Sequence, residues 1–198
     1  FIAFGGLFMQ KVGFLFVAIA LTLAAAARSA RAESYTLDPV HSALLFKVSH
    51  LGASYSFGVF HSPEGKVTWD SADPTKSSIE VTAKVANLNT FNAKRDEHLR
   101  SPDFFDAKQF PSLTFKSTSI KSLGDDLYEV SGDLTIRGTT KPITVNLKKM
   151  GTAEMRGTVK TGFDGKFTIN RMDFGVAYMP QGIGTDVDVH VALEVNKD

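Results

Sequence analysis

The densest group of chemically useful side chains is the run Arg95-Asp96-Glu97-His98-Leu99-Arg100. Arg95, His98 and Arg100 supply hydrogen-bond donors that can bind an anion such as a phosphate or carboxylate head group. Asp96 and Glu97 are adjacent, so on a helix they point in different directions and do not form a catalytic pair. The alternative is a solvent-facing helix that Arg95 and Asp96 tie to the rest of the fold. The sequence favours this alternative without excluding anion binding.

The histidines are the candidate metal ligands, and they are His41, His50, His61, His98 and His190. None of them forms a close pair at i,i+2 or i,i+4, and no other ligand motif lies near them. One face of a strand-like segment carries Asp186, Asp188 and His190. We interpret it as an exposed polar face. We therefore predict no metal site and no cofactor.

No catalytic motif in the chain is complete. The run Gly52-Ala53-Ser54-Tyr55-Ser56 lacks the last glycine of a nucleophile elbow, and Gly165-Lys166-Phe167 lacks the hydroxyl residue of a phosphate-binding loop. The chain has no Cys, which excludes disulfides, thiolate metal sites and Cys nucleophiles. A net charge of +1 gives no support to nucleic-acid binding. These observations favour a protein that is not an enzyme and does not bind nucleic acid.

Residues 1–32 differ from the rest of the chain. Lys11 precedes an apolar run over residues 12–27, and Ala30-Arg31-Ala32 supplies the small-x-small pattern of a cleavage site. The run is shorter than the ~20 residues of a membrane-spanning helix. We predict a cleaved signal peptide over residues 1–32, with residues 1–8 an upstream extension before a start at Met9. The mature chain, residues 33–198, is then periplasmic or secreted and has no stable membrane span.

The elements that must position these side chains are nearly all strands. Apolar and polar residues alternate with period two over residues 42–50, 56–60, 67–69, 78–85, 113–117, 128–136, 143–147, 163–169 and 186–195. Turn signals such as Gly124-Asp125-Asp126 and Arg137-Gly138 separate them. Only residues 92–100 break the rhythm, and they predict a short helix that ends before Pro102.

About eight strands with one apolar face each predict an all-β protein, because an antiparallel barrel hides that face and removes exposed edges. The inward positions combine aromatic residues with small ones such as Gly58, Ala83, Gly132 and Gly165. Large-against-small core packing explains this pattern, and so does a cavity lined for an apolar ligand. Sequence alone leaves open whether the barrel is filled or hollow.

The chain contains the stretches Tyr35-Thr36-Leu37-Asp38-Pro39-Val40-His41-Ser42, Phe46-Lys47-Val48-Ser49-His50-Leu51-Gly52, Phe57-Gly58-Val59-Phe60, 95–106, 110–117, 132–142 and Asn170-Arg171-Met172-Asp173-Phe174-Gly175. These motifs resemble those of the YceI-like family of exported polyisoprenoid-binding proteins. Their order and spacing cover essentially all of residues 35–195. The resemblance implies a lipocalin-like antiparallel barrel with a helical segment beside it. It also implies an elongated apolar pore for a long isoprenoid or similar acyl chain, and no catalysis.

We therefore expect residues 33–198 to form a lipid-binding barrel that carries a long-chain isoprenoid or fatty-acyl lipid, in lipid or quinone metabolism, transport, storage or a stress response. The residues expected to line the pore are Phe46, Val48, Phe60, Trp69, Val81, Phe115, Leu134, Ile136, Phe167 and Val189. Arg95 and His98 are the expected head-group contacts. The alternatives are a lipid-acting enzyme of unknown type and a filled structural or stress-interaction barrel without a ligand. A homodimer also stays open.

Overall fold

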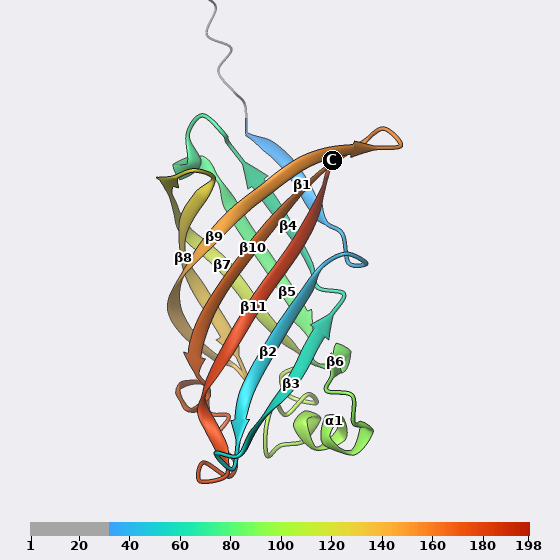
Figure 1. Ribbon diagram of the computed structural model, residues 1–198, viewed down its shortest axis with the longest axis vertical. Helices are drawn as coiled ribbons and strands as arrows, with labels where there is room; N and C mark the ends of the chain where they lie inside the picture. The colour runs from blue at the N-terminus through green and yellow to red at the C-terminus, as the bar shows by residue number, and fades with distance from the viewer. Residues whose placement is uncertain (1–31) are drawn as a thin grey trace, which may run out of the picture.

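A computed structural model describes residues 32–198 (Figure 1). The predicted signal peptide and its upstream extension therefore lie outside the described residues, apart from Ala32. The described residues form eleven strands and one α-helix: β1 (Glu33–Leu37), β2 (Ala43–His50), β3 (Ser54–His61), β4 (Glu64–Trp69), β5 (Ser78–Lys84), β6 (Leu88–Asn89), α1 (Ala93–Arg100), β7 (Ser112–Gly124), β8 (Leu127–Ile136), β9 (Thr139–Met155), β10 (Thr158–Asn170) and β11 (Ile183–Lys197). Short 3-10 helices span Pro74–Lys76, Val85–Asn87 and Arg171–Phe174.

Eight of the strands close into an antiparallel ring in the order β1-β4-β5-β7-β8-β9-β10-β11, and β11 pairs back to β1. The prediction of an all-β, lipocalin-like barrel of about eight strands with a short helix is thus confirmed. Its long strands run obliquely around the long axis (Figure 1). The sequence analysis did not identify β1, because its five residues contain only one clear apolar alternation.

β11 pairs with two consecutive strands along the same edge. Its last residues pair with β1, where Val195 lies opposite Leu37. Its first two thirds pair with β2, where Val189 lies opposite Phe46. After β1, the chain therefore turns away from β11 over residues 38–42. It then pairs with β11 again through β2, lower down the barrel. In consequence β2 and β3 form the wall of the lower half of the barrel in Figure 1.

The connections in the middle of the chain are tight two-residue hairpins. Residues Asp125 and Asp126, which join β7 to β8, have φ angles of 49° and 59°. Arg137 and Gly138, which join β8 to β9, have φ angles of 49° and 72°. Positive φ at both central positions is typical of a type I′ turn, whose twist matches that of the flanking strands. Both turns were predicted from the sequence.

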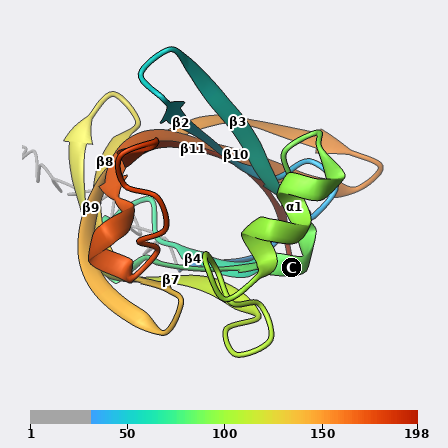
Figure 2. The same ribbon diagram turned by 90° about the horizontal axis from the view of Figure 1, so that it is seen from below.

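The lower part of the barrel closes through side chains. β6 pairs with β3, and Phe60 of β3, Ala83 of β5 and Leu88 of β6 form one buried cluster. Phe105, which follows α1, packs edge-on against Phe60 with ring centroids 5.5 Å apart. Seen from below, α1 lies beside the end of the ring (Figure 2). The helix and the segment after it therefore cover this end of the barrel.

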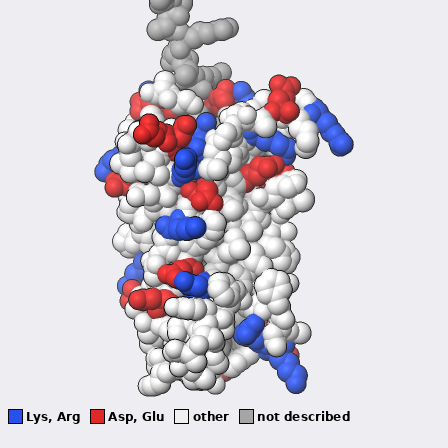
Figure 3. Space-filling view, in the orientation of Figure 1, with Lys and Arg blue, Asp and Glu red and all other residues white. Residues whose placement is uncertain are grey.

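Pairs of opposite charge lie on the outer surface of the barrel. On the face shown in Figure 3 the charged side chains gather over its upper and middle parts. Lys47 of β2 pairs with Asp188 of β11 at 2.9 Å, and His190 contacts Asp164 at 2.6 Å. The alternating polar residues near the C-terminus thus pair with neighbouring strands, as expected for an exposed face. Within residues 32–198, no helix has the length and apolar character needed to cross a membrane.

Candidate functional site: an apolar cavity inside the barrel

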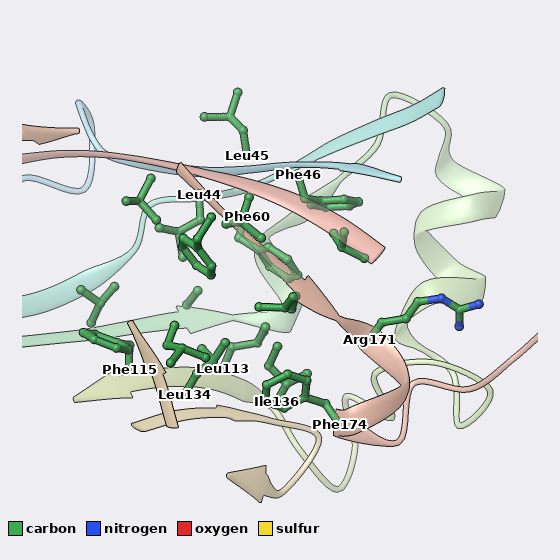
Figure 4. Close-up of a pocket in the computed structure, with 18 of the residues that line it drawn as sticks. Leu44, Leu45, Phe46, Phe60, Leu113, Phe115, Leu134, Ile136, Arg171 and Phe174 are labelled. Atoms are coloured by element: carbon green, nitrogen blue, oxygen red, sulfur yellow. The ribbon is translucent and has the colours of Figure 1, made fainter. Parts of the chain in front are cut away.

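The barrel encloses a cavity of about 190 Å³ whose wall is almost entirely hydrocarbon. The wall combines inward-facing side chains of β2, β3, β5, β7, β8, β9, β10 and β11 with residues from α1 and from the segments after α1 and β10. Thr114 and Arg171 are the polar members of this lining among the described residues. In Figure 4, side chains such as Phe46 and Phe60 face those of Phe115 and Leu134 across the cavity.

The cavity is long and narrow. Its lining on β11 runs from Ile183 to Leu193 through Val187, Val189 and Val191. At about 3.3 Å per residue, this stretch is roughly 33 Å long. The volume is below the roughly 300–1,000 Å³ of typical small-molecule pockets. The shape therefore suits a thin flexible chain. Because the cavity volume is small, a long chain fits only when lining side chains change rotamer.

Nine of the ten residues predicted to line a pore line this cavity: Phe46, Val48, Phe60, Val81, Phe115, Leu134, Ile136, Phe167 and Val189. Trp69 is not among the lining residues, so its predicted place is corrected. It lies at the end of β4, is 3% exposed and packs against the rings of Tyr128 and Phe163 at 4.7 and 5.1 Å. These aromatic rings fill the barrel at the end away from α1.

Two glycines in the wall make room for aromatic rings. A Cβ atom on Gly58 would lie 2.3 Å from the ring of Phe46, and one on Gly132 would lie 2.5 Å from the ring of Phe115. Both rings line the cavity. The large-against-small packing inferred from the sequence and a hollow interior therefore occur together, because the glycines let the rings lie flat against the wall.

Sequence reasoning missed the lining residues outside the strands. They are Leu99, Phe104, Phe105, Arg171, Phe174 and Val176. Phe104, Phe174 and Val176 form a buried cluster with Ile136, which closes the cavity at the α1 end. The adjacent Phe104 and Phe105 were the available signal, since two aromatic residues directly after a charged helix must cover an apolar surface.

The charged side chains of α1 make their contacts within the fold. Arg95 donates from Nε to the Thr90 hydroxyl at 2.8 Å and from Nη2 to the Thr90 carbonyl at 2.6 Å. Asp96, which is buried, accepts from the Thr90 amide at 2.8 Å. His98 contacts Asp103 at 2.9 Å. Arg95 and Asp96 thus tie the helix to the end of β6, and neither Arg95 nor His98 lines the cavity.

Arg171 is the charged residue that does line the cavity. It begins the 3-10 helix Arg171–Phe174, is 6% exposed and lies at the α1 end of the lining (Figure 4). Its guanidinium donates to the carbonyls of Val176, Ile183 and Gly184 at 2.5 to 2.8 Å. No carboxylate among the described residues forms an ion pair with it. Burial lowers the pKa of Arg171, but an arginine in a protein keeps its proton.

A second polar cluster, made of Asp38, His41, Lys160 and Glu194, lies outside the cavity lining. Asp38, His41 and Glu194 have the spacing of metal ligands. However, the Lys160 ammonium lies 3.0 Å from Asp38 and 2.8 Å from Glu194, so it supplies the positive charge that these carboxylates need. Hydrogen bonds from His41 and then Lys160 hold the pKa of Asp38 well below its usual value. Asp38 also accepts from the amides of Val40 and His41, so the cluster fixes the turn between β1 and β2.

Comparison with known proteins points to one family. A family model described as a YceI-like domain matches residues 35–195. A Pseudomonas putida protein named UPF0312 protein is 39% identical over 189 residues, which cover 94% of this chain and 97% of that protein. The crystal structure of a Campylobacter jejuni YCEI protein superimposes with a TM-score of 0.68 at 30% identity, covering 76% of this chain and 90% of that one. A polyisoprenoid binding domain from Saccharophagus degradans, implicated in plant cell wall breakdown, has the same fold at 17% identity and a TM-score of 0.66, covering 84% and 99% of the two chains.

Proposed function

This chain belongs to the YceI-like domain family, and from that premise we propose that it is an exported carrier that holds a long isoprenoid or fatty-acyl chain inside its barrel. One observation carries the proposal, the continuous hydrocarbon lining of the long cavity. A polar ligand would lose its hydrogen bonds to water there and regain few, which costs free energy. A hydrocarbon chain loses nothing of this kind. The name of the Saccharophagus degradans relative supports an isoprenoid as one such chain.

The energetics require a long chain. Each buried CH₂ group contributes about 0.8 kcal/mol, whereas association costs roughly 4–15 kcal/mol of lost freedom. A chain of a few carbons therefore does not bind measurably, and one of well over about ten carbons does. Because apolar contacts are not directional, the cavity selects by chain length and width more than by chemical detail.

The lining also supports binding without catalysis. General acid–base chemistry needs a titratable side chain within hydrogen-bond reach of the reacting group. The described residues place Thr114 and Arg171 in the lining as its polar members, and neither titrates near neutral pH. The proposal therefore assigns the barrel a carrier role, and the predicted export would place that role in the periplasm or outside the cell.

The proposal is tested by extracting lipid from protein purified under native conditions and identifying it by mass spectrometry. A matched pair of variants controls for non-specific lipid. Val189→Phe places a larger side chain in the cavity. Val59→Phe is the control, because it makes the same change on β3 at a position outside the lining, where the neighbouring Gly58 and Phe60 face inward. We expect a long-chain lipid in wild type and in Val59→Phe, and severalfold less in Val189→Phe. Absence of any chain from wild type, or equal amounts in both variants, would favour a filled structural barrel.

A further inference from the structure

The wall of the barrel is split between β9 and β10 toward the α1 end. Among the described residues, the two strands pair as far as Leu147 and Gly165, and there the pairing ends. Both strands extend further: β9 reaches back to Thr139 beside β8, and β10 runs on to Asn170 beside β11. The two facing strand edges therefore carry backbone N–H and C=O groups that are not paired across the split.

Pro142 explains why the two strands separate here. The residues of an antiparallel strand bond alternately to the neighbour on one side and to the neighbour on the other. Thr139 closes the two-residue hairpin to β8, so every second residue from Thr139 onward bonds β8. Pro142 lies between two of these residues, and its backbone is directed toward β10. Because a proline has no N–H to donate, it makes this side of β9 an edge.

A cleft of about 340 Å³ lies along the split. Residues 141–143 of β9 form one border, residues 168–170 of β10 form another, and Asp173 and Phe174 of the last 3-10 helix form the third. The cleft is polar, unlike the cavity, and its one ammonium and one carboxylate give it no net charge. The polar side chains that line it are those of Lys141, Thr168, Asn170 and Asp173.

Three apolar residues connect the cleft to the cavity, because Ile143, Ile169 and Phe174 line both. Ile143 and Ile169 each lie four residues beyond the last pair, Leu147 and Gly165, so they would be opposite each other if the pairing continued. Both isoleucines are half-buried. A change of rotamer in these two side chains therefore opens the cavity to the cleft without breaking a hydrogen-bonded ladder.

Buried side chains fill the barrel elsewhere. In the described sheet β3 pairs with β2 and β6 but not with β5, and Phe60 and Leu88 belong to the buried cluster that closes this seam. Trp69 is buried among other rings at the end away from α1. The split between β9 and β10 is instead bordered by exposed residues such as Pro142 and Thr168. A chain that enters at the split does not have to displace a buried cluster.

We infer that the cleft binds the head group of a single-chain lipid, an uncharged polar group such as a hydroxyl or an amide, and that the chain enters the cavity between Ile143 and Ile169. The inference rests on the proposed function, since it concerns the same ligand. A hydroxyl or an amide bonds the unpaired backbone groups of the two strand edges, which otherwise need water. The balanced charges of the lining give no net attraction to a charged head group. The chain lies in hydrocarbon throughout.

Two probes with the same chain test where the head group lies: hexadecanol, and hexadecyl maltoside below its micelle concentration. Binding of hexadecanol reports the proposed function alone. A maltose unit is too large and too polar for a hydrocarbon cavity of about 190 Å³, but it can extend from an open cleft into water. We expect wild type to bind both probes with similar affinity. Binding of hexadecanol without binding of the maltoside would overturn the inference and leave the carrier function intact, whereas binding of neither would remove both.

Two variants test the route of entry. Thr168→Phe places a ring in the cleft. Thr118→Phe is the matched control, because both residues are exposed strand threonines that donate one hydrogen bond, Thr168 to Asp188 at 2.8 Å and Thr118 to the Ser131 carbonyl at 3.3 Å. Thr118 lies in neither lining. Exchange of bound, isotope-labelled hexadecanol for unlabelled alcohol should slow severalfold in Thr168→Phe and stay at the wild-type rate in Thr118→Phe.

Thr168→Phe should also weaken binding of hexadecyl maltoside more than binding of hexadecanol, since the ring competes with the larger head group. Exchange at the same rate in both variants would show that the chain takes another route and would refute the inference. The comparison of the two probes on wild type needs no variant, so it decides the place of the head group even if Thr168→Phe does not fold.

Discussion

Gly58 lies beneath the ring of Phe46, and replacing it with alanine tests how closely the cavity wall is packed. The added Cβ would lie 2.3 Å from Phe46 Cζ and 2.8 Å from Thr90 Cγ2, whereas ordinary van der Waals contacts begin at 3.4 Å. The ring must therefore retreat by about 1 Å, toward the cavity that it lines. Overpacking of this kind costs about 1–3 kcal/mol. Alanine recovers only about 0.4–1 kcal/mol by restricting the unfolded chain.

The net effect of Gly58→Ala is then a loss of about 1–2 kcal/mol, which for a domain of this size lowers the melting temperature by about 2–8 °C. Thermal and urea unfolding followed by circular dichroism measure it. Gly151→Ala is the matched control, because nothing lies within 4 Å of a Cβ at that strand position. It should be neutral or slightly stabilising. The displaced ring should also narrow the cavity and weaken binding of hexadecanol.

The double variant Phe46→Leu, Gly58→Ala tests whether the clash with the Phe46 ring causes the loss of stability. If it does, the shorter side chain relieves the clash, and the double variant is more stable than the sum of the single effects by about 1–2 kcal/mol. Additive effects, or a Gly58→Ala protein as stable as wild type, would refute the reasoning. The wall would then be loose at this point, and the cavity would be a poor selector of chain width.

Three further predictions concern what holds the barrel together. Asp96→Ala removes two hydrogen bonds to Thr90 and should cost about 2–4 kcal/mol in urea unfolding, and a loss under about 0.5 kcal/mol would contradict the assigned role. Val195→Ala truncates a fully buried side chain outside the cavity lining. It should lower the free energy of unfolding by about 2–3 kcal/mol without changing the binding of hexadecanol. Because folding lowers the pKa of Asp38 from 3.8, its ionised form stabilises the fold above about pH 4, and this contribution is lost as the pH falls. Asp38→Asn should therefore be less stable at neutral pH and lose less stability on acidification, and parallel stability curves would show that other groups dominate.

The sequence by itself determined the architecture, because strand alternation and turn chemistry are local properties. Period-two patterns predicted the long strands, and Asp125, Asp126 and Gly138 marked turns at positions that require positive φ. The alternation also separates inward from outward residues, which is why nine lining residues could be named. The break at residues 92–100 predicted α1, whose N-cap Asn92 accepts from the Arg95 amide at 3.0 Å.

Only the tertiary structure decided what each end of the barrel contains. Trp69 has the same alternation as the lining residues, but its height along the barrel, which depends on the register of β4 with β1 and β5, places it in the aromatic cluster. Arg95 and Arg171 both lie in short helices, and no local pattern shows that Thr90 engages the first while the second lies at the cavity. These differences arise from contacts between segments distant in the chain, which residue type and spacing do not encode locally.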